Sequence, residues 1–261
     1  MARLRIISPH FTNEKSRIAA DVRAYLAQLA QGQHEISYVT LRVGPSSIEN
    51  ELDAALAVPG ILEQVVQAEK DGVDAVIVSC FGDPGVGAAR TVGNILVFGP
   101  GQTSMHAAAL LGHRFSVISV AESVRPMIEN NSRLYGLTDK LASIRVIDIP
   151  VLQMLNDTEA LNQALAKQAI LAVRQDKADV IVLGCTGFLG TAEAVKAILQ
   201  AQQIYVPVID PLPTTIAIAQ AISGLKLAHD PLLYTPNLHK PTKGYEVLFD
   251  SLQPTVEAKT A

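Results

Sequence analysis

DGVDAVIVSCFGDPG, residues 71–85, and DKADVIVLGCTGFLG, residues 176–190, share one pattern. Each stretch begins with an acidic turn, continues as an unbroken apolar run, and passes through a cysteine into a glycine-containing turn. An apolar run without alternation is typical of a parallel strand that is buried on both faces. Glycines after such a strand let the backbone turn sharply and approach a ligand closely. We therefore predict two equivalent strand-turn units, with Cys80 and Cys185 at their carboxyl ends.

The repeat extends beyond these two stretches. RLRIIS at residues 3–8 aligns with RFSVIS at residues 114–119, and Pro100 aligns with Pro211. In each half, predicted strands alternate with predicted helices, and this order specifies a parallel sheet with right-handed crossovers. We predict an α/β fold of two pseudo-twofold-related lobes, each a mostly parallel four-stranded sheet flanked by helices, with the active site in the cleft between them.

The helices after the two aligned prolines lie where the repeats join, so we expect each to cross to the other lobe. One lobe then consists of residues 1–99 and 213–261 and carries Cys80. The other consists of residues 100–212 and carries Cys185. No segment is low enough in complexity to be a linker, so we expect the lobes to be tightly apposed.

Local patterns set the expected limits of the elements. Thr12 or Asn13 is suited to cap the first helix, and the Gly/Pro-rich residues 99–103 predict a break before a helix over residues 104–112. The tail, residues 232–249, has no clear period and is expected to drape over a lobe. Besides the two cysteine strands, the predicted strands cover residues 3–9, 34–43, 94–98, 113–120, 143–150 and 204–209.

Composition and charge exclude several classes of protein. The formal net charge of −4 gives no electrostatic reason to expect nucleic acid or an anionic membrane as a partner. No stretch approaches the ~20 apolar residues of a membrane span, and the N-terminus enters a predicted strand without a signal peptide. We expect a cytoplasmic homo-oligomer that binds a small-molecule substrate and keeps its thiols reduced.

The sequence contains no motif for a metal or a cofactor, and we predict neither. The six histidines are scattered and do not have the spacing of a zinc site. There is no dinucleotide fingerprint, no phosphate-binding loop and no G-x-S-x-G elbow. His106 lies within an apolar helix, which favours a core or interface role.

The two cysteines are the only ones in the chain. A single cysteine at the end of a buried strand is explained by packing, but two at corresponding points of a repeat favour a function. Two facing lobes place one thiol on each side of a bound molecule, which is the geometry needed to invert a carbon stereocentre. A helix N-terminus after each turn is expected to lower the thiol pKa.

The turns after the cysteines also carry candidate groups. Backbone N–H groups at Phe81-Gly82 and Thr186-Gly187 are suited to hold a developing enolate oxygen. Asp83 begins an Asp-Pro-Gly sequence, and turn formation is sufficient to explain it. A carboxylate beside a cysteine is also able to tune the thiol.

Four segments resemble the aspartate/glutamate/hydantoin racemase superfamily on its hydantoin and allantoin racemase branch. They are SCFGDPGVGAAR at 79–90, GQTSMHAAALLGHRFSVIS at 101–119, LGCTGF at 183–188 and PVIDP at 207–211. The resemblance implies a cofactor-independent racemase in which Cys80 and Cys185 are the acid/base residues. It also implies a substrate-binding set made of Ser8, His10, Phe81, Gly82, Asp83, Thr186 and Gly187. The branch usually carries Asn-Pro-Asn where this chain has Ser8-Pro9-His10.

The leading hypothesis is an isomerase that racemises 5-substituted hydantoins, or a related cyclic ureide such as allantoin, by 1,1-proton transfer through an enolate. Three alternatives keep the fold and change the reaction: a maleate-type cis–trans isomerase, a decarboxylase and an amino acid racemase. A decarboxylase of this kind uses one cysteine, so two cysteines disfavour it. A further alternative, from another class of protein, is a non-catalytic small-molecule binder with inert buried cysteines.

Overall fold

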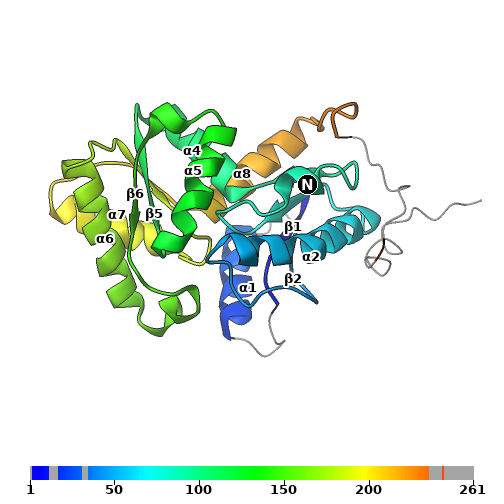
Figure 1. Cartoon of the computed structure of the whole chain (residues 1–261), viewed down its shortest axis with the longest axis horizontal. Coiled ribbons are helices and arrows are strands. Elements are labelled where there is room, and N and C mark those ends of the chain that lie inside the picture. Colours follow the sequence, from blue (N-terminus) through cyan, green and yellow to red (C-terminus); the bar gives the residue numbers. More distant parts are fainter. Residues whose placement is uncertain (1, 12–16, 31–34, 235–242, 244–261) are drawn as a thin grey trace, which may run out of the picture.

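The computed structural model describes residues 2–11, 17–30, 35–234 and 243. It contains two four-stranded sheets, with strand orders β2-β1-β3-β4 and β6-β5-β7-β8, and all pairings are parallel. Figure 1 shows the two sheets with their helices side by side, one built from each half of the chain. The predicted α/β fold with two parallel sheets is confirmed. The strands are β1 (Arg3–Ser8), β2 (Glu35–Thr40), β3 (Ala75–Val78), β4 (Leu96–Phe98), β5 (Phe115–Ser119), β6 (Leu141–Val146), β7 (Val180–Leu183) and β8 (Val208–Ile209).

Helices cover both sheets, as expected for parallel strands joined by crossovers. Three short 3₁₀ turns, Glu122–Val124, Thr138–Lys140 and Val151–Asn156, lie between them. The α-helices are α1 (Arg17–Ala30), α2 (Glu51–Lys70), α3 (Val86–Ala89), α4 (Pro100–Leu111), α5 (Arg125–Leu134), α6 (Thr158–Arg174), α7 (Thr191–Ala201) and α8 (Pro211–Gly224).

The two cysteine strands occupy equivalent places. β3 lies between β1 and β4, and β7 lies between β5 and β8. All four residues of β3 and all four of β7 are buried, which is what their unbroken apolar sequences predict. Parallel pairing places the carboxyl ends of neighbouring strands at the same edge, so each cysteine turn emerges beside the end of β1 or β5.

The helices α4 and α8 pack against each other and carry side chains into separate cores. Met105 of α4 lies in a core cluster with Phe115 of the second sheet. Leu212 and Ile216 of α8 lie in a cluster with Ile6 of the first sheet. The residue limits that the sequence suggested for the two lobes stay a prediction.

Three predicted limits are wrong. Helix α4 begins at Pro100 instead of residue 104, because proline needs no N–H partner in the first turn of a helix. Strand β6 covers Leu141–Val146, so it begins and ends earlier than the predicted strand, residues 143–150. Only Val208 and Ile209 of the predicted last strand pair with β7.

Some predictions fall outside the described residues. These are the cap at Thr12 or Asn13, the start of the second strand at residue 34, and most of the tail. Among the described residues, no helix combines the length and apolar character needed to cross a membrane.

Two glycines shape the ends of the cysteine turns. Gly85 precedes α3 with φ of 66°, and Gly190 precedes α7 with φ of 69°. This left-handed conformation is strained for any residue that has a Cβ atom. The glycines therefore let each turn reverse direction into the helix that follows.

Replacing Gly85 by alanine should lower the free energy of unfolding by about 1–2 kcal/mol, because the new Cβ occupies a left-handed residue. It would also lie 3.2 Å from the Val58 side chain. Gly87→Ala is the matched control, since nothing lies within 4 Å of a Cβ added there. Urea denaturation of both variants checks the difference, and equal stabilities would contradict it.

Candidate active site

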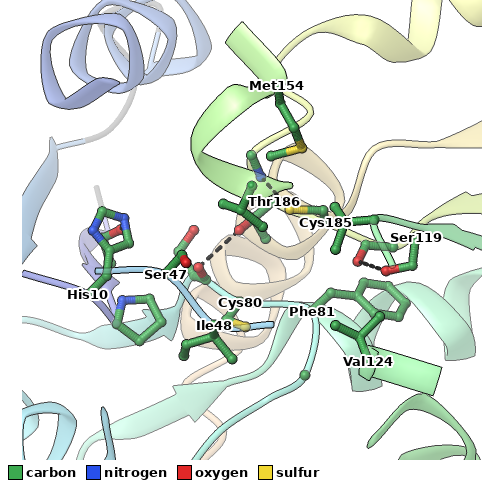
Figure 2. A pocket seen from close by; sticks show the side chains of 18 of the residues that line it. His10, Ser47, Ile48, Cys80, Phe81, Ser119, Val124, Met154, Cys185 and Thr186 are labelled. Carbon is green, nitrogen blue, oxygen red and sulfur yellow. Dashed lines mark hydrogen bonds between the residues drawn. The ribbon is translucent and has the colours of Figure 1, made fainter. Parts of the chain in front are cut away.

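A cavity of about 440 Å³ lies at the carboxyl ends of the two sheets. Cys80 and Cys185 both line it, and both residues are partly exposed. Figure 2 shows the two cysteines on separate segments of the cavity wall. The structure thus brings together the two thiols that the repeat singled out, one from the end of β3 and one from the end of β7.

The backbone before each cysteine is held in the same way. The N–H of Ser79 donates to the carbonyl of Ile7 at 2.8 Å, and the N–H of Gly184 donates to the carbonyl of Ile118 at 2.7 Å. The hydrogen-bond ladder of each sheet therefore continues past the end of the strand. As a result, each cysteine begins its turn from a rigid position.

The two cysteine segments are also tied to each other. The hydroxyl of Thr186 donates to the carbonyl of Ser79 at 2.9 Å, which links the second turn to the end of the first cysteine strand. The hydroxyl of Ser119 donates to the carbonyl of Gly184 at 3.0 Å. Thr186, predicted from the turn, therefore both lines the cavity and joins the two halves.

The backbone N–H groups of the turns divide into two sets. The N–H of Gly187 lies 3.3 Å from Cys185 Sγ, and a Gly82 N–H hydrogen bond favours the Cys80 thiolate. Within the described part of the chain, the N–H groups of Phe81 and Thr186 have no hydrogen-bond partner. Of the four predicted donors, two thus contact the sulfur atoms, and the other two have no partner among the described residues.

The expected lowering of the thiol pKa values is wrong. Burial raises the pKa of Cys80 to about 12, and burial raises the pKa of Cys185 to about 11. The hydrogen bonds from Gly82 and Gly187 act in the opposite direction but do not outweigh the loss of solvation. Helix α3 is only four residues long, so its dipole contributes little at Cys80.

The end of β1 supplies a polar part of the cavity wall. Ser8 and His10 both line the cavity, as predicted residues of the pocket, and Ser8 Oγ lies 2.7 Å from His10 Nε2. Burial lowers the pKa of His10, so the imidazole is neutral at physiological pH. In Figure 2, His10 and Ser47 lie on the opposite side of the cysteine turns from Val124.

Apolar side chains that the sequence did not single out line the other part of the cavity, beside Phe81. They come from the residues after β5, from α5 and from the 3₁₀ turn after β6: Val120, Val124, Met127, Ile128, Leu152 and Met154. Such positions follow helical or turn patterns that are indistinguishable from ordinary core patterns in the sequence.

Two loops cover the cavity from opposite lobes. Ser46, Ser47 and Ile48 follow β2. The carboxylate of Glu49 accepts a hydrogen bond at 3.1 Å from the N–H of Val151, which lies in the corresponding loop after β6. In the sequence, residues 44–47 read GPSS, a pattern that indicates a turn but not a cavity wall.

Asp83 is the one predicted substrate-binding residue that does not line the cavity. Its buried carboxylate instead accepts hydrogen bonds from Gly101 N, Gln102 N and the hydroxyl of Tyr135. His106 is exposed on α4 and its ring bonds to the carbonyl of Gln102. Of the core or interface role predicted for it, the core role is therefore wrong and the interface role stays a prediction.

The α/β fold with two parallel sheets is the fold of known racemases. The profile of the Asp/Glu/Hydantoin racemase family matches residues 12–221. The chain belongs to this family, and its enzyme class is that of a racemase, an isomerase, as the sequence predicted.

Particular relatives place the chain within the hydantoin and allantoin branch. It is 31% identical to the hydantoin racemase of Pseudomonas sp. (strain NS671) over 85% of this chain and 86% of that one. It is 36% identical to the hydantoin racemase of Rhizobium meliloti over 69% of this chain and 73% of that one. Allantoin racemase from Klebsiella pneumoniae superposes with a TM-score of 0.85 at 28% identity, over 95% of this chain and 99% of that one. A glutamate racemase from Bacillus anthracis, with a TM-score of 0.55 at 16% identity over 90% of this chain and 85% of that one, shares the fold alone.

The raised thiol pKa values predict slow alkylation at neutral pH. Only the thiolate reacts, so the rate of modification by iodoacetamide should rise about tenfold per pH unit up to about pH 10. Mass spectrometry of the peptides that contain Cys80 and Cys185 checks each site separately. Fast modification of either thiol at neutral pH would contradict the effect of burial described above.

Proposed function

We propose that this enzyme racemises 5-substituted hydantoins by 1,1-proton transfer between Cys80, the substrate and Cys185. The observation that carries the proposal is the position of the thiols: they come from equivalent strand ends of two lobes and line one cavity. The relatives named as hydantoin racemases support the substrate class.

In this mechanism, one cysteine is a thiolate and the other a thiol when the substrate binds. The thiolate removes the C5 proton from one face, and the electron pair of the C–H bond moves into the ring carbonyl to form an enolate. The opposite thiol then donates its proton to the other face of C5. The two cysteines end with exchanged protonation states, and the opposite enantiomer uses them in reverse.

The free N–H groups of Phe81 and Thr186 are the donors that we assign to the enolate oxygen. Donors that are fixed before the reaction stabilise developing charge without a reorganisation cost. The high thiol pKa values also serve this chemistry, because a thiolate that is poorly solvated is a stronger base toward carbon. The same high pKa values leave only a small fraction of thiolate at neutral pH, which lowers the fraction of active enzyme.

The distribution of polar groups in the cavity favours a hydantoin with an apolar substituent over allantoin. Ser8 and His10 suit the ring N–H and carbonyl groups, whereas Val124 and Met154 suit an alkyl or aryl group at C5. The ureido group of allantoin would lose hydrogen bonds with water against this apolar wall.

A free amino acid is a less suitable substrate. Within the described residues, no lysine or arginine lines the cavity to bind an α-carboxylate. Arg90 instead bonds to the carbonyl of Val97 and to the side chain of Gln102. Arg125 pairs with Glu122. Both arginines therefore interact with groups of the protein and not with the cavity.

Proton NMR in D₂O tests the reaction. Each enantiomer of benzylhydantoin and isobutylhydantoin should lose its C5 proton signal and its optical activity in the presence of enzyme. Exchange without enzyme is subtracted, because hydantoins racemise unaided. If no hydantoin exchanges above this background, the substrate class is wrong.

Single-thiol variants test the roles of the cysteines. Cys80→Ser and Cys185→Ser should each lower kcat for racemisation by about a hundredfold or more, because one acid/base group is lost. Each variant should keep slow C5 exchange, without inversion, of the one enantiomer whose proton faces the remaining thiol. If both variants lose C5 exchange of the same enantiomer, the two thiols do not lie on opposite faces of the substrate.

The apolar wall predicts a substrate preference. The kcat/KM for benzylhydantoin should exceed that for allantoin by about tenfold or more. Burial of the phenyl ring of the substituent should stabilise the bound state by at least about 1.4 kcal/mol. Val124→Thr, which adds a hydroxyl at nearly constant volume, should reduce this preference. Equal kcat/KM values for both substrates would show that the wall does not select the substituent.

A further inference from the structure

Two carboxylates bind the first turns of the crossing helices α4 and α8, behind the cysteine turns, although they stand at different positions of the sequence repeat. Asp83 lies in the turn after β3, and Asp210 follows β8, the strand beside β7. Neither residue lines the cavity, so neither has a place in the reaction described above.

Asp83 joins three parts of the protein. Its own N–H donates to the carbonyl of Cys80 at 3.1 Å, which closes the turn. Its carboxylate accepts hydrogen bonds from Gly101 N at 2.8 Å and Gln102 N at 2.6 Å, in the first turn of α4. It also accepts one at 2.7 Å from the hydroxyl of Tyr135, whose ring packs against the core of the second sheet.

Asp210 makes similar contacts on the other side, although it is the residue before α8 and not part of a cysteine turn. Its carboxylate accepts a hydrogen bond at 3.2 Å from Leu212 N, in the first turn of α8. It accepts another at 3.2 Å from the hydroxyl of Tyr25 on α1, which flanks the first sheet. The Tyr25 ring also lies against Gly190 at the end of the Cys185 turn, with Cε2 3.6 Å from where a Cβ would stand. Each carboxylate is thus bound by a tyrosine from the opposite lobe.

We propose that Asp83 and Asp210 are a matched pair of positioning residues, Asp83 for the Cys80 turn and Asp210 for the Cys185 turn. Asp83 fastens the Cys80 turn to the N-terminus of α4, and Asp210 joins the N-terminus of α8 to Gly190 at the end of the Cys185 turn. Through Tyr135 and Tyr25, each carboxylate also contacts the other lobe. Together the two bridges set the separation of the thiols across the substrate. This inference rests on the function of the thiols proposed above.

Each carboxylate also acts on the thiol of its own side. Its negative charge opposes ionisation: Asp83 contributes to the raised pKa of Cys80, and Asp210 contributes to that of Cys185. The other charged group near Cys185 is Glu49, and the other titratable group near Cys80 is Cys185 itself. The two effects are therefore separable by substitution.

The surroundings of the carboxylates decide their charge. Burial raises the pKa of Asp83 to about 6, against the hydrogen bond from Tyr135 and the nearby charge of Arg90. Burial also raises the pKa of Asp210, against hydrogen bonds that include that of Tyr25. Asp83 is ionised above neutral pH, so its replacement by a neutral amide removes a charge there.

Site-resolved alkylation of the full-length protein tests the pairing and needs no substrate. At about pH 8, Asp83→Asn should accelerate modification of Cys80 by iodoacetamide about three- to tenfold, with Cys185 unchanged. Asp210→Asn should accelerate Cys185 and leave Cys80 unchanged. Each variant is the control for the other. Equal acceleration of both thiols in either variant, or none, would overturn the assignment.

The tyrosine variants test the bridges and keep both carboxylates. Tyr135→Phe and Tyr25→Phe should each lower kcat for hydantoin racemisation about tenfold and change KM less than about twofold, because thiol placement and not binding is affected. Thermal melting identifies any variant that fails to fold, and the variants that do fold still test the Tyr–Asp bridges. Unchanged kcat in both tyrosine variants would overturn the bridges. Side-specific alkylation without any hydantoin racemisation would keep the pairing and reject the proposed substrate.

Discussion

The burial of two thiols at the ends of two fully buried strands is the constraint on which the rest of the site depends. β3 and β7 are covered on both faces, so the residues of the strands themselves are shielded and a ligand can approach only at a strand end. The cysteines stand at these ends, where desolvation raises their pKa values and where the sheet holds their backbone. A rigid, poorly solvated thiol pair is slow to ionise but strongly basic once ionised. The turns reflect this balance, since Gly82 and Gly187 direct N–H groups at the sulfur atoms.

The relation between the lobes is set by contacts that neither lobe makes alone. Helices α4 and α8 pack against each other, and Thr186 bonds across to the carbonyl of Ser79. Glu49 joins the two loops over the cavity, and two Tyr–Asp hydrogen bonds span the lobes behind the turns. Stereochemical inversion needs two acid/base groups at a fixed separation, so these interlobe contacts bear directly on the chemistry.

The repeat is symmetric in its thiols and asymmetric in its walls. The end of β1 carries Ser8 and His10, which form a polar pair, whereas the equivalent end of β5 carries Ser119 alone and leads into Val120 and then Val124. In the proposed mechanism, the equivalent turns present one thiol to each face of the reacting carbon. The proposed hydantoin ring would be held in one orientation by walls that differ.

The sequence alone determined the parallel sheets, the equivalence of Cys80 and Cys185, and the family, because unbroken apolar runs and a repeated motif are local signals. It also identified the turns and the residues Ser8 and His10. It could not give the direction of the thiol pKa shifts, since the sequence shows the helix that follows but not the depth of burial. Only the tertiary structure decided that Asp83 faces α4 and Tyr135 instead of the cavity, and that Val124 and Met154 form a wall. These outcomes depend on residues that are distant in the sequence and meet only when the two lobes pack together.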